Sequence, residues 1–116
     1  LMPLAPVFSS ILNPKILTPE EKGRVFENIV GQRLSEHFSE VFFWREGKAE
    51  IDYVVITPHG LTGIEVKTTE KPSTQKGKGI AAFKTKFSSA KICIIDFKNY
   101  DAFERDPKNF LSKYAF

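Results

Sequence analysis

Two β-prone segments separated by a tight breaker constrain the fold of this chain more than any other feature. Residues 49–56 and 61–68 are rich in β-branched side chains, and residues 57–60 (Thr-Pro-His-Gly) favour a turn between them. Such a pattern predicts an antiparallel hairpin. If the hairpin closes symmetrically, Ile56 pairs with Leu61 and the register of both strands follows.

That register predicts a cluster of charged side chains. Counting back from the turn places Asp52 opposite Glu65 and Glu50 opposite Lys67, and alternation along each strand predicts all four on one face. Opposed Cβ atoms lie about 5 Å apart, so two facing carboxylates destabilise the sheet unless a cation joins them. Mg²⁺ suits this position, because it is usually held by one or two carboxylates plus water and substrate phosphate.

The chemistry expected of such a site is phosphodiester hydrolysis. A metal with open positions polarises the phosphodiester, lowers the pKa of a bound water and stabilises charge on the phosphate oxygens. For Lys67 we favour charge stabilisation or water positioning over a role as general base. In the alternative interpretation, Asp52 and Glu65 are exposed strand residues and Lys67 pairs with Glu50 on the surface.

A helix from Pro19 to about Phe38 is predicted ahead of the hairpin. Thr18 is a good N-cap, Pro19 suits the first helical position, and Glu21 completes a capping box. An apolar face at helical spacing is formed by Val25, Phe26, Ile29, Val30, Leu34 and Phe38. Glu27 lies at the margin of this face, where a carboxylate needs a partner.

The remaining elements follow from composition and breakers. The prolines of residues 1–17 predict an extended lead-in that packs Val7, Phe8, Ile11 and Leu12 and belongs to a missing N-terminal part; residues 18–116 are expected to form one domain. Before the hairpin we expect a strand at 41–44 with a turn at Gly47 and Lys48. After it we expect a basic loop at 71–79, a short helix at 80–87 and a strand at 91–97. Residues 98–116 are expected to form a tail that packs on the domain, with a helix start at Asp106.

Several motifs in this order resemble the PD-(D/E)XK nuclease superfamily. The broad pattern is a helix with an embedded Glu, then Ile51-Asp52, a gap of twelve residues and Glu65-Val66-Lys67. More narrowly, the chain resembles the C-terminal nuclease-like domain attached to many bacterial and archaeal P-loop ATPases, through residues 23–28 (Gly-Arg-Val-Phe-Glu-Asn), 44–46 (Trp-Arg-Glu), 50–55 (Glu-Ile-Asp-Tyr-Val-Val) and 64–67 (Ile-Glu-Val-Lys). The similarity runs from about residue 23 to residue 97.

The resemblance implies an α/β (α+β) fold with a restriction-endonuclease-like αβββαβ core. It maps the catalytic set onto Glu27, Asp52, Glu65 and Lys67, with Mg²⁺ or Mn²⁺ held by Asp52, Glu65 and, through a water, Glu27. The implied activity is that of an endonuclease on nucleic acid, with DNA as the expected substrate and an N-terminal P-loop ATPase domain as partner. One alternative is a catalytically silent DNA- or protein-binding module, and another is an interaction domain without a nucleic-acid role.

Other side chains carry weaker expectations. Arg45, Lys76, Lys78 and Lys84 are candidate nucleic-acid contacts, and the net charge of +3 permits phosphate binding without requiring it. Trp44 is expected in the core rather than stacked on a base, and His59 in an exposed turn. The lone cysteine, Cys93, lies in an apolar run and predicts a buried thiol, which together with the lack of a membrane span favours a cytoplasmic protein.

Overall fold

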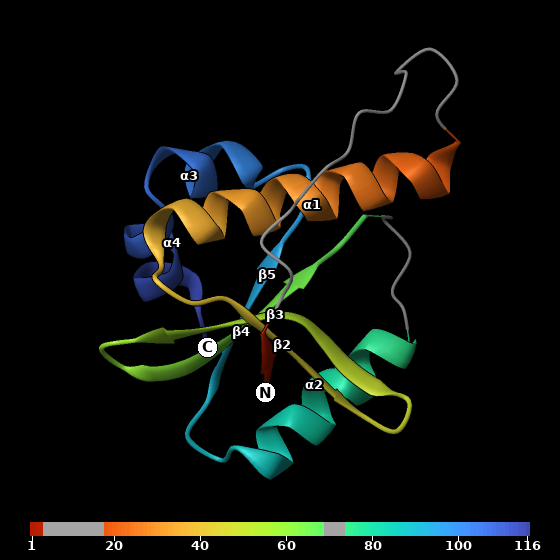
Figure 1. Cartoon of the computed structure of the whole chain (residues 1–116), viewed down its shortest axis with the longest axis vertical. Coiled ribbons are helices and arrows are strands. Elements are labelled where there is room, and N and C mark those ends of the chain that lie inside the picture. Colours follow the sequence, from red (N-terminus) through yellow and green to blue (C-terminus); the bar gives the residue numbers. More distant parts are fainter. Residues whose placement is uncertain (4–17, 69–73) are drawn as a thin grey trace.

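One mixed sheet lies between two helical layers. The structure, a computed structural model, describes residues 1–3, 18–68 and 74–116. Helix α1 (Pro19–His37) covers one face together with α3 (Tyr100–Arg105) and α4 (Pro107–Tyr114), and α2 (Thr74–Lys86) covers the other (Figure 1). The expected α/β class with a mixed central sheet flanked by helices is confirmed. None of the helices in these described ranges is both long and apolar enough to cross a membrane.

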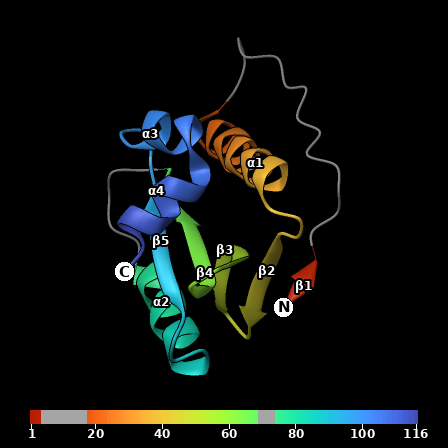
Figure 2. The same ribbon diagram turned by 90° about the vertical axis from the view of Figure 1, so that its left-hand side faces the viewer.

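The sheet has five strands within the described residues, in the order β1-β2-β3-β4-β5 (Figure 2). Their bounds are β1 (Met2–Pro3), β2 (Phe42–Glu46), β3 (Ala49–Thr57), β4 (Gly60–Val66) and β5 (Lys91–Ile95). The pairs β1–β2, β2–β3 and β3–β4 are antiparallel, whereas β5 runs parallel to β4 after the crossover through α2. From α1 to β5 the elements follow the expected α-β-β-β-α-β order.

Helix α1 forms for the local reasons that its sequence predicts. Glu21 donates its backbone N–H to Thr18 Oγ1 at 3.2 Å, and Glu21 Oε1 accepts from the Thr18 N–H at 3.1 Å, which completes the capping box. The buried residues Phe26, Val30 and Leu34 face the sheet. Ile29, predicted on the same face, is 41% exposed, so the buried stripe is narrower than expected.

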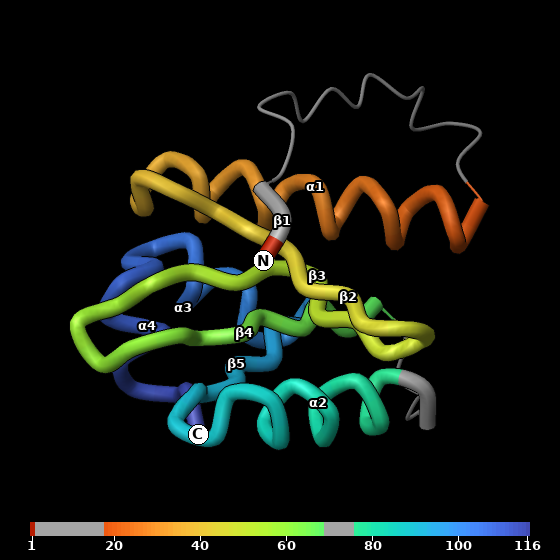
Figure 3. The backbone as a smooth tube through the Cα atoms, turned by 60° about the horizontal axis from the view of Figure 1, so that its bottom comes forward, coloured from red at the N-terminus to blue at the C-terminus, as the bar shows by residue number. Residues whose placement is uncertain are grey.

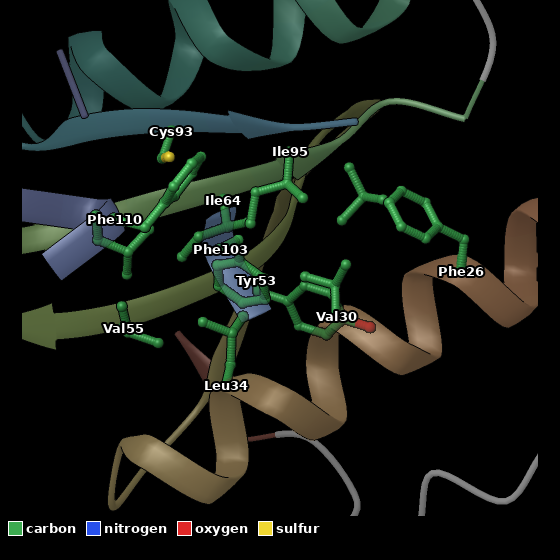
Figure 4. Close-up of a cluster of buried hydrophobic side chains, with 12 residues drawn as sticks. Phe26, Val30, Leu34, Tyr53, Val55, Ile64, Cys93, Ile95, Phe103 and Phe110 are labelled. Atoms are coloured by element: carbon green, nitrogen blue, oxygen red, sulfur yellow. The ribbon is translucent and has the colours of Figure 1, made fainter. Parts of the chain in front are cut away.

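The core on the α1 side is completed by the C-terminal tail. Figure 4 shows Phe103 and Phe110 close to Tyr53 and Cys93, and the contacts place them in one cluster with the α1 side chains. The predicted helix start at Asp106 is confirmed, because its carboxylate accepts from the Asn109 N–H at 3.2 Å. A second tail helix, α3, was not predicted. The tail therefore forms part of the core on this side of the sheet.

Two expectations about buried side chains are confirmed. Trp44 is 5% exposed and packs edge-on against Phe83 and Phe87, with ring centroids 5.5 and 6.4 Å away, so it belongs to the α2-side core. Cys93 is buried, and burial raises the pKa of its thiol to about 12. His59 lies exposed in the hairpin turn, as expected.

The start of α2 differs from the prediction. The basic loop expected over residues 71–79 is wrong for residues 74–79, which are helical. Gly77 and Gly79 favoured the loop interpretation, but Gly79 is needed for packing, since a Cβ there would lie 2.5 Å from the backbone oxygen of Glu50. Residues 71–73 of the predicted loop lie outside the described residues. The same holds for the four apolar residues of the lead-in that were predicted to pack on the domain, Val7, Phe8, Ile11 and Leu12.

Strand ends also differ from the predictions. Strand β2 is displaced by one to two residues, β4 ends at Val66 rather than at residue 68, and β5 ends at Ile95 rather than at residue 97. Lys67 follows the last residue of β4, although its N–H still donates to the Ile95 carbonyl at 2.8 Å. Figure 3 shows the β3–β4 hairpin extending between the helical layers.

Candidate functional site

The β3–β4 hairpin has the predicted register. Its paired residues run from Thr57 and Gly60 at the turn to Tyr53 and Ile64. One further step in the same register brings Asp52 opposite Glu65. These two acids therefore come from adjacent strands, at the end of the hairpin that lies away from the turn.

Reciprocal hydrogen bonds hold the two carboxylates in place. Asp52 donates its backbone N–H to Glu65 Oε1 at 3.0 Å. Val66 donates its N–H to Asp52 Oδ2 at 2.8 Å. Each carboxylate thus accepts from the backbone of the opposite strand, which fixes the side chains beside one another.

A β-bulge lies beside Asp52. Phe42 pairs with Val54 and Trp44 with Ile51, so β3 contains one extra residue relative to β2. The strict alternation that we assumed for β3 is therefore wrong, because Ile51 packs on the α2 side whereas Tyr53 packs on the α1 side. The bulge leaves Asp52 at the point where the strand changes face.

Lys76 joins the two carboxylates from α2. Its ammonium lies 3.3 Å from Asp52 Oδ2 and 3.6 Å from Glu65 Oε2, and it also donates to the Val66 carbonyl. Burial opposes a charge on Lys76, but the carboxylates of Asp52 and Glu65 outweigh it and raise the pKa of the ammonium. The acid pair therefore contacts a cation of the protein's own.

The electrostatics favour a cation at this place. Glu65 is 3% exposed, and burial followed by the charge of Asp52 raises its pKa to about 7. Burial and the charge of Asp52 also raise the pKa of Glu27, to about 6. Ionising Glu27 and Glu65 therefore costs free energy, and a cation nearby would reduce this cost.

Tyr53 connects the helix acid to the sheet. Its hydroxyl donates to the backbone carbonyl of Glu27 at 2.6 Å, so the α1 segment that carries Glu27 is attached to β3 one residue from Asp52. Burial, followed by the charges of Glu27 and Asp52, raises the pKa of the Tyr53 hydroxyl. The hydroxyl therefore stays neutral and keeps its role as a donor.

Among the described residues, Lys67 does not form an ion pair with Asp52 or Glu65. Lys67 is half-buried just beyond β4. The predicted contact between Glu50 and Lys67 is also absent from the described part, where Glu50 pairs with Arg45 of β2 at 3.2 Å. The β2–β3 register explains this pairing, because Arg45 and Glu50 are directly opposite.

The residues predicted to contact nucleic acid lie on α2 and β2 and have different surroundings. Lys76 turns toward the carboxylates, whereas Lys78 is exposed on the same helix. Lys84 lies with its ammonium 4.6 Å from the ring centre of Phe116. Arg45 is exposed on β2 and pairs with Glu50.

Sequence reasoning missed the position of Lys76 beside the acids. Once α2 is extended back through its glycines, Lys76, Ile80 and Phe83 follow the i, i+4, i+7 spacing of a helix face turned toward the sheet. Phe83 is fully buried and Ile80 half-buried, which fits that face. The signal was present in the spacing but was hidden by Gly77 and Gly79.

The oxygen atoms at the acid pair suit a hard divalent cation that takes only a few of its ligands from the protein. Asp52, Glu65 and the Val66 carbonyl supply oxygen atoms around one point, which is the ligand type that Mg²⁺ and Mn²⁺ prefer. No group of three or more acidic, histidine or cysteine side chains with metal-binding geometry occurs within the described ranges. A metal at this site would therefore keep positions for water or substrate.

A pocket of about 500 Å³ lies at the other end of the hairpin. The end of α1, the hairpin turn and α4 contribute its lining, which includes His37, His59, Lys91 and Lys108. None of the predicted catalytic residues lines it. The pocket is therefore separate from the acid pair.

Comparison with known protein families places this chain in one of them. Residues 22–114 match the family described as a domain of unknown function, DUF4143. Because the match covers most of the chain, the protein belongs to this family. No curated protein and no solved structure matches the chain.

Proposed function

We propose that this chain is a metal-dependent nuclease domain of the PD-(D/E)XK type that hydrolyses phosphodiester bonds in DNA. The observation that carries the proposal is the buried carboxylate of Glu65 beside Asp52 at the end of the central hairpin. Burying two neighbouring acids costs free energy that a structural role alone does not explain. Perturbed acids of this kind are concentrated at functional sites.

The proposed roles follow from the chemistry of each group. Asp52, Glu65 and the Val66 carbonyl would hold Mg²⁺ or Mn²⁺, which when bound polarises the phosphodiester and activates water. Glu27, with its pKa raised to about 6, is suited to hold a water or to exchange a proton near neutral pH. Lys67, at the end of β4, would place positive charge against the substrate phosphate.

The order of elements and motifs also supports the proposal. A helix acid, an acid on β3 and a Glu-x-Lys at the end of β4 occur in an α-β-β-β-α-β chain, as in the superfamily that the sequence resembles. The same resemblance leads us to propose a P-loop ATPase domain as the N-terminal partner. The protein would then act in the cytoplasm, where DNA and ATP are both available.

Plasmid cleavage tests this function. Purified protein with Mn²⁺ or Mg²⁺ should nick supercoiled plasmid, and EDTA should abolish the nicking. The rate of nicking should fall by at least about 100-fold in each of the variants Asp52→Asn, Glu65→Gln and Lys67→Met. The reason is that these side chains, directly or through the metal, would stabilise the charge that develops on the phosphate in the transition state. Glu46→Gln and Lys86→Met remove charges from an exposed ion pair and should leave the rate unchanged. Absence of cleavage, or equal rates in all variants, would overturn the proposal.

One observation favours a second candidate function. Lys76 pairs with both acids, whereas Lys67 forms no ion pair with them in the described part. This arrangement suits a silent nuclease-like module for binding DNA. Such a module would bind DNA with an affinity that falls steeply with salt, because phosphate contacts release counterions. Salt-dependent binding without nicking at any metal concentration would favour this candidate over the nuclease.

A further inference from the structure

Within the described part of the chain, the ammonium of Lys76 lies among three oxygen acceptors. Asp52 Oδ2 and Glu65 Oε2 lie 3.3 and 3.6 Å from it, and the Val66 carbonyl accepts a hydrogen bond from it. These three groups are also the ones that would hold the divalent cation. The Lys76 ammonium and a divalent cation would therefore compete for the same oxygen ligands.

We propose that Lys76 is a built-in competitor of the metal, which occupies the cation position in the metal-free protein and leaves when a divalent cation binds. This inference rests on the proposed function and adds a regulation of the same site. The site would be closed by Lys76 at low metal concentration and opened only when metal displaces it. Its apparent metal affinity would then be set by the lysine as well as by the carboxylates.

Electrostatics exclude simultaneous occupation. A divalent cation within contact of Asp52 and Glu65 would lie within about 4 Å of the ammonium, and like charges at that distance repel strongly in a half-buried site. The Glu65 side chain is 4% exposed and that of Asp52 18%, so water screens this repulsion weakly. One positive group has to leave.

The position of Lys76 on α2 is unfavourable for the helix itself. It is the third residue of α2, and the first turn of this helix contains no acidic residue. The positive end of a helix dipole disfavours a lysine there. The ion pairs with Asp52 and Glu65 offset this cost.

The lysine also has a route out. Its side chain is 36% exposed, and its long stem allows the ammonium to reach water without unfolding α2. Displacement therefore requires a change of rotamer rather than of fold.

Calorimetric titration with MnCl₂ tests the inference without relying on activity. Lys76→Met should bind Mn²⁺ at least about tenfold more tightly than the wild type, a factor that corresponds to about 1.4 kcal/mol. Lys78→Met is the matched control, because it removes the same charge from an exposed position two residues away. Its affinity should stay within about twofold of the wild type.

The outcomes separate this inference from the proposed function. Equal or weaker Mn²⁺ affinity in Lys76→Met overturns the inference and leaves the nuclease proposal standing. Equal tightening in Lys78→Met also overturns it, since net charge would then explain the effect. Failure of both the wild type and Lys76→Met to bind Mn²⁺ overturns the inference and the metal site together. If Lys76→Met does not fold, Lys76→Gln carries the same test, since it keeps a donor for the Val66 carbonyl.

Discussion

At the scale of single residues, Glu65 carries the highest electrostatic cost in the site. Its carboxylate is almost fully buried and lies beside Asp52, and both effects raise its pKa to about 7. The Asp52 N–H and Lys76 oppose this shift without cancelling it. The charged form of Glu65 therefore lowers the stability of the metal-free protein.

The pH dependence of unfolding follows from this shift. Glu65 has a higher pKa folded than unfolded, so its contribution is fully present below the unfolded pKa of 4.5 and is lost as pH rises to about 7. We expect the free energy of unfolding to fall over that range by up to about 3 kcal/mol, measured by urea denaturation without metal. Glu65→Gln should flatten the slope, whereas the exposed control Glu46→Gln should not. An unchanged slope in Glu65→Gln would contradict this account.

At the scale of elements, the packing of α2 on β3 positions Lys76. Gly79 allows this packing, because the helix approaches the Glu50 backbone too closely for a side chain. Phe83, one turn further on, is fully buried against Trp44. The helix thus has one contact that requires glycine and one that requires a large ring.

Two alanine substitutions on α2 should have opposite effects. Gly79→Ala should lower the free energy of unfolding by about 1–3 kcal/mol, because its Cβ would overlap the Glu50 carbonyl. Gly77→Ala should raise it by about 0.5–1 kcal/mol, because nothing lies near that Cβ and alanine favours the helix. Chemical denaturation of both variants measures the difference. Equal effects would show that α2 does not approach β3 as described.

The local elements were predictable from the sequence, and the tertiary features were not. The capping box of α1 and the hairpin register depend on neighbouring residues, so Glu21 and Leu61 were placed correctly. The bulge beside Asp52 depends on pairing with β2, and the extension of α2 depends on contact with β3. The position of Lys76 depends in turn on where α2 begins, which Gly77 and Gly79 hid in the sequence. The assignment of the four catalytic residues stays a prediction.

At the scale of the whole molecule, the C-terminal tail completes both the core and the sheet. Phe103, Phe110 and Leu111 are buried with the α1 side chains. The last residue, Phe116, exchanges two backbone hydrogen bonds with Ile92 of β5, at 2.8 and 2.9 Å. The tail is therefore part of the folding unit that carries the site.

Removal of residues 99–116 should unfold the protein. The loss of three large buried side chains costs about 5–9 kcal/mol, which is comparable to the whole stability of a small domain. Circular dichroism and thermal melting of the truncated chain should show no cooperative transition. Removal of residues 115–116 alone is the control and should leave a folded protein with a lower melting temperature, since Phe116 is 60% exposed. A cooperative melt of the longer truncation would contradict this role of the tail.

The central claim is that Asp52 and Glu65 together hold a divalent cation. A crystal of the wild-type protein soaked in MnCl₂ tests it most directly, through anomalous diffraction near the manganese edge. We expect an anomalous peak within about 2.0–2.4 Å of an oxygen of each carboxylate, with the Lys76 ammonium moved away from it. A well-ordered crystal without a peak between these carboxylates, and with Lys76 still paired to them, would contradict the account.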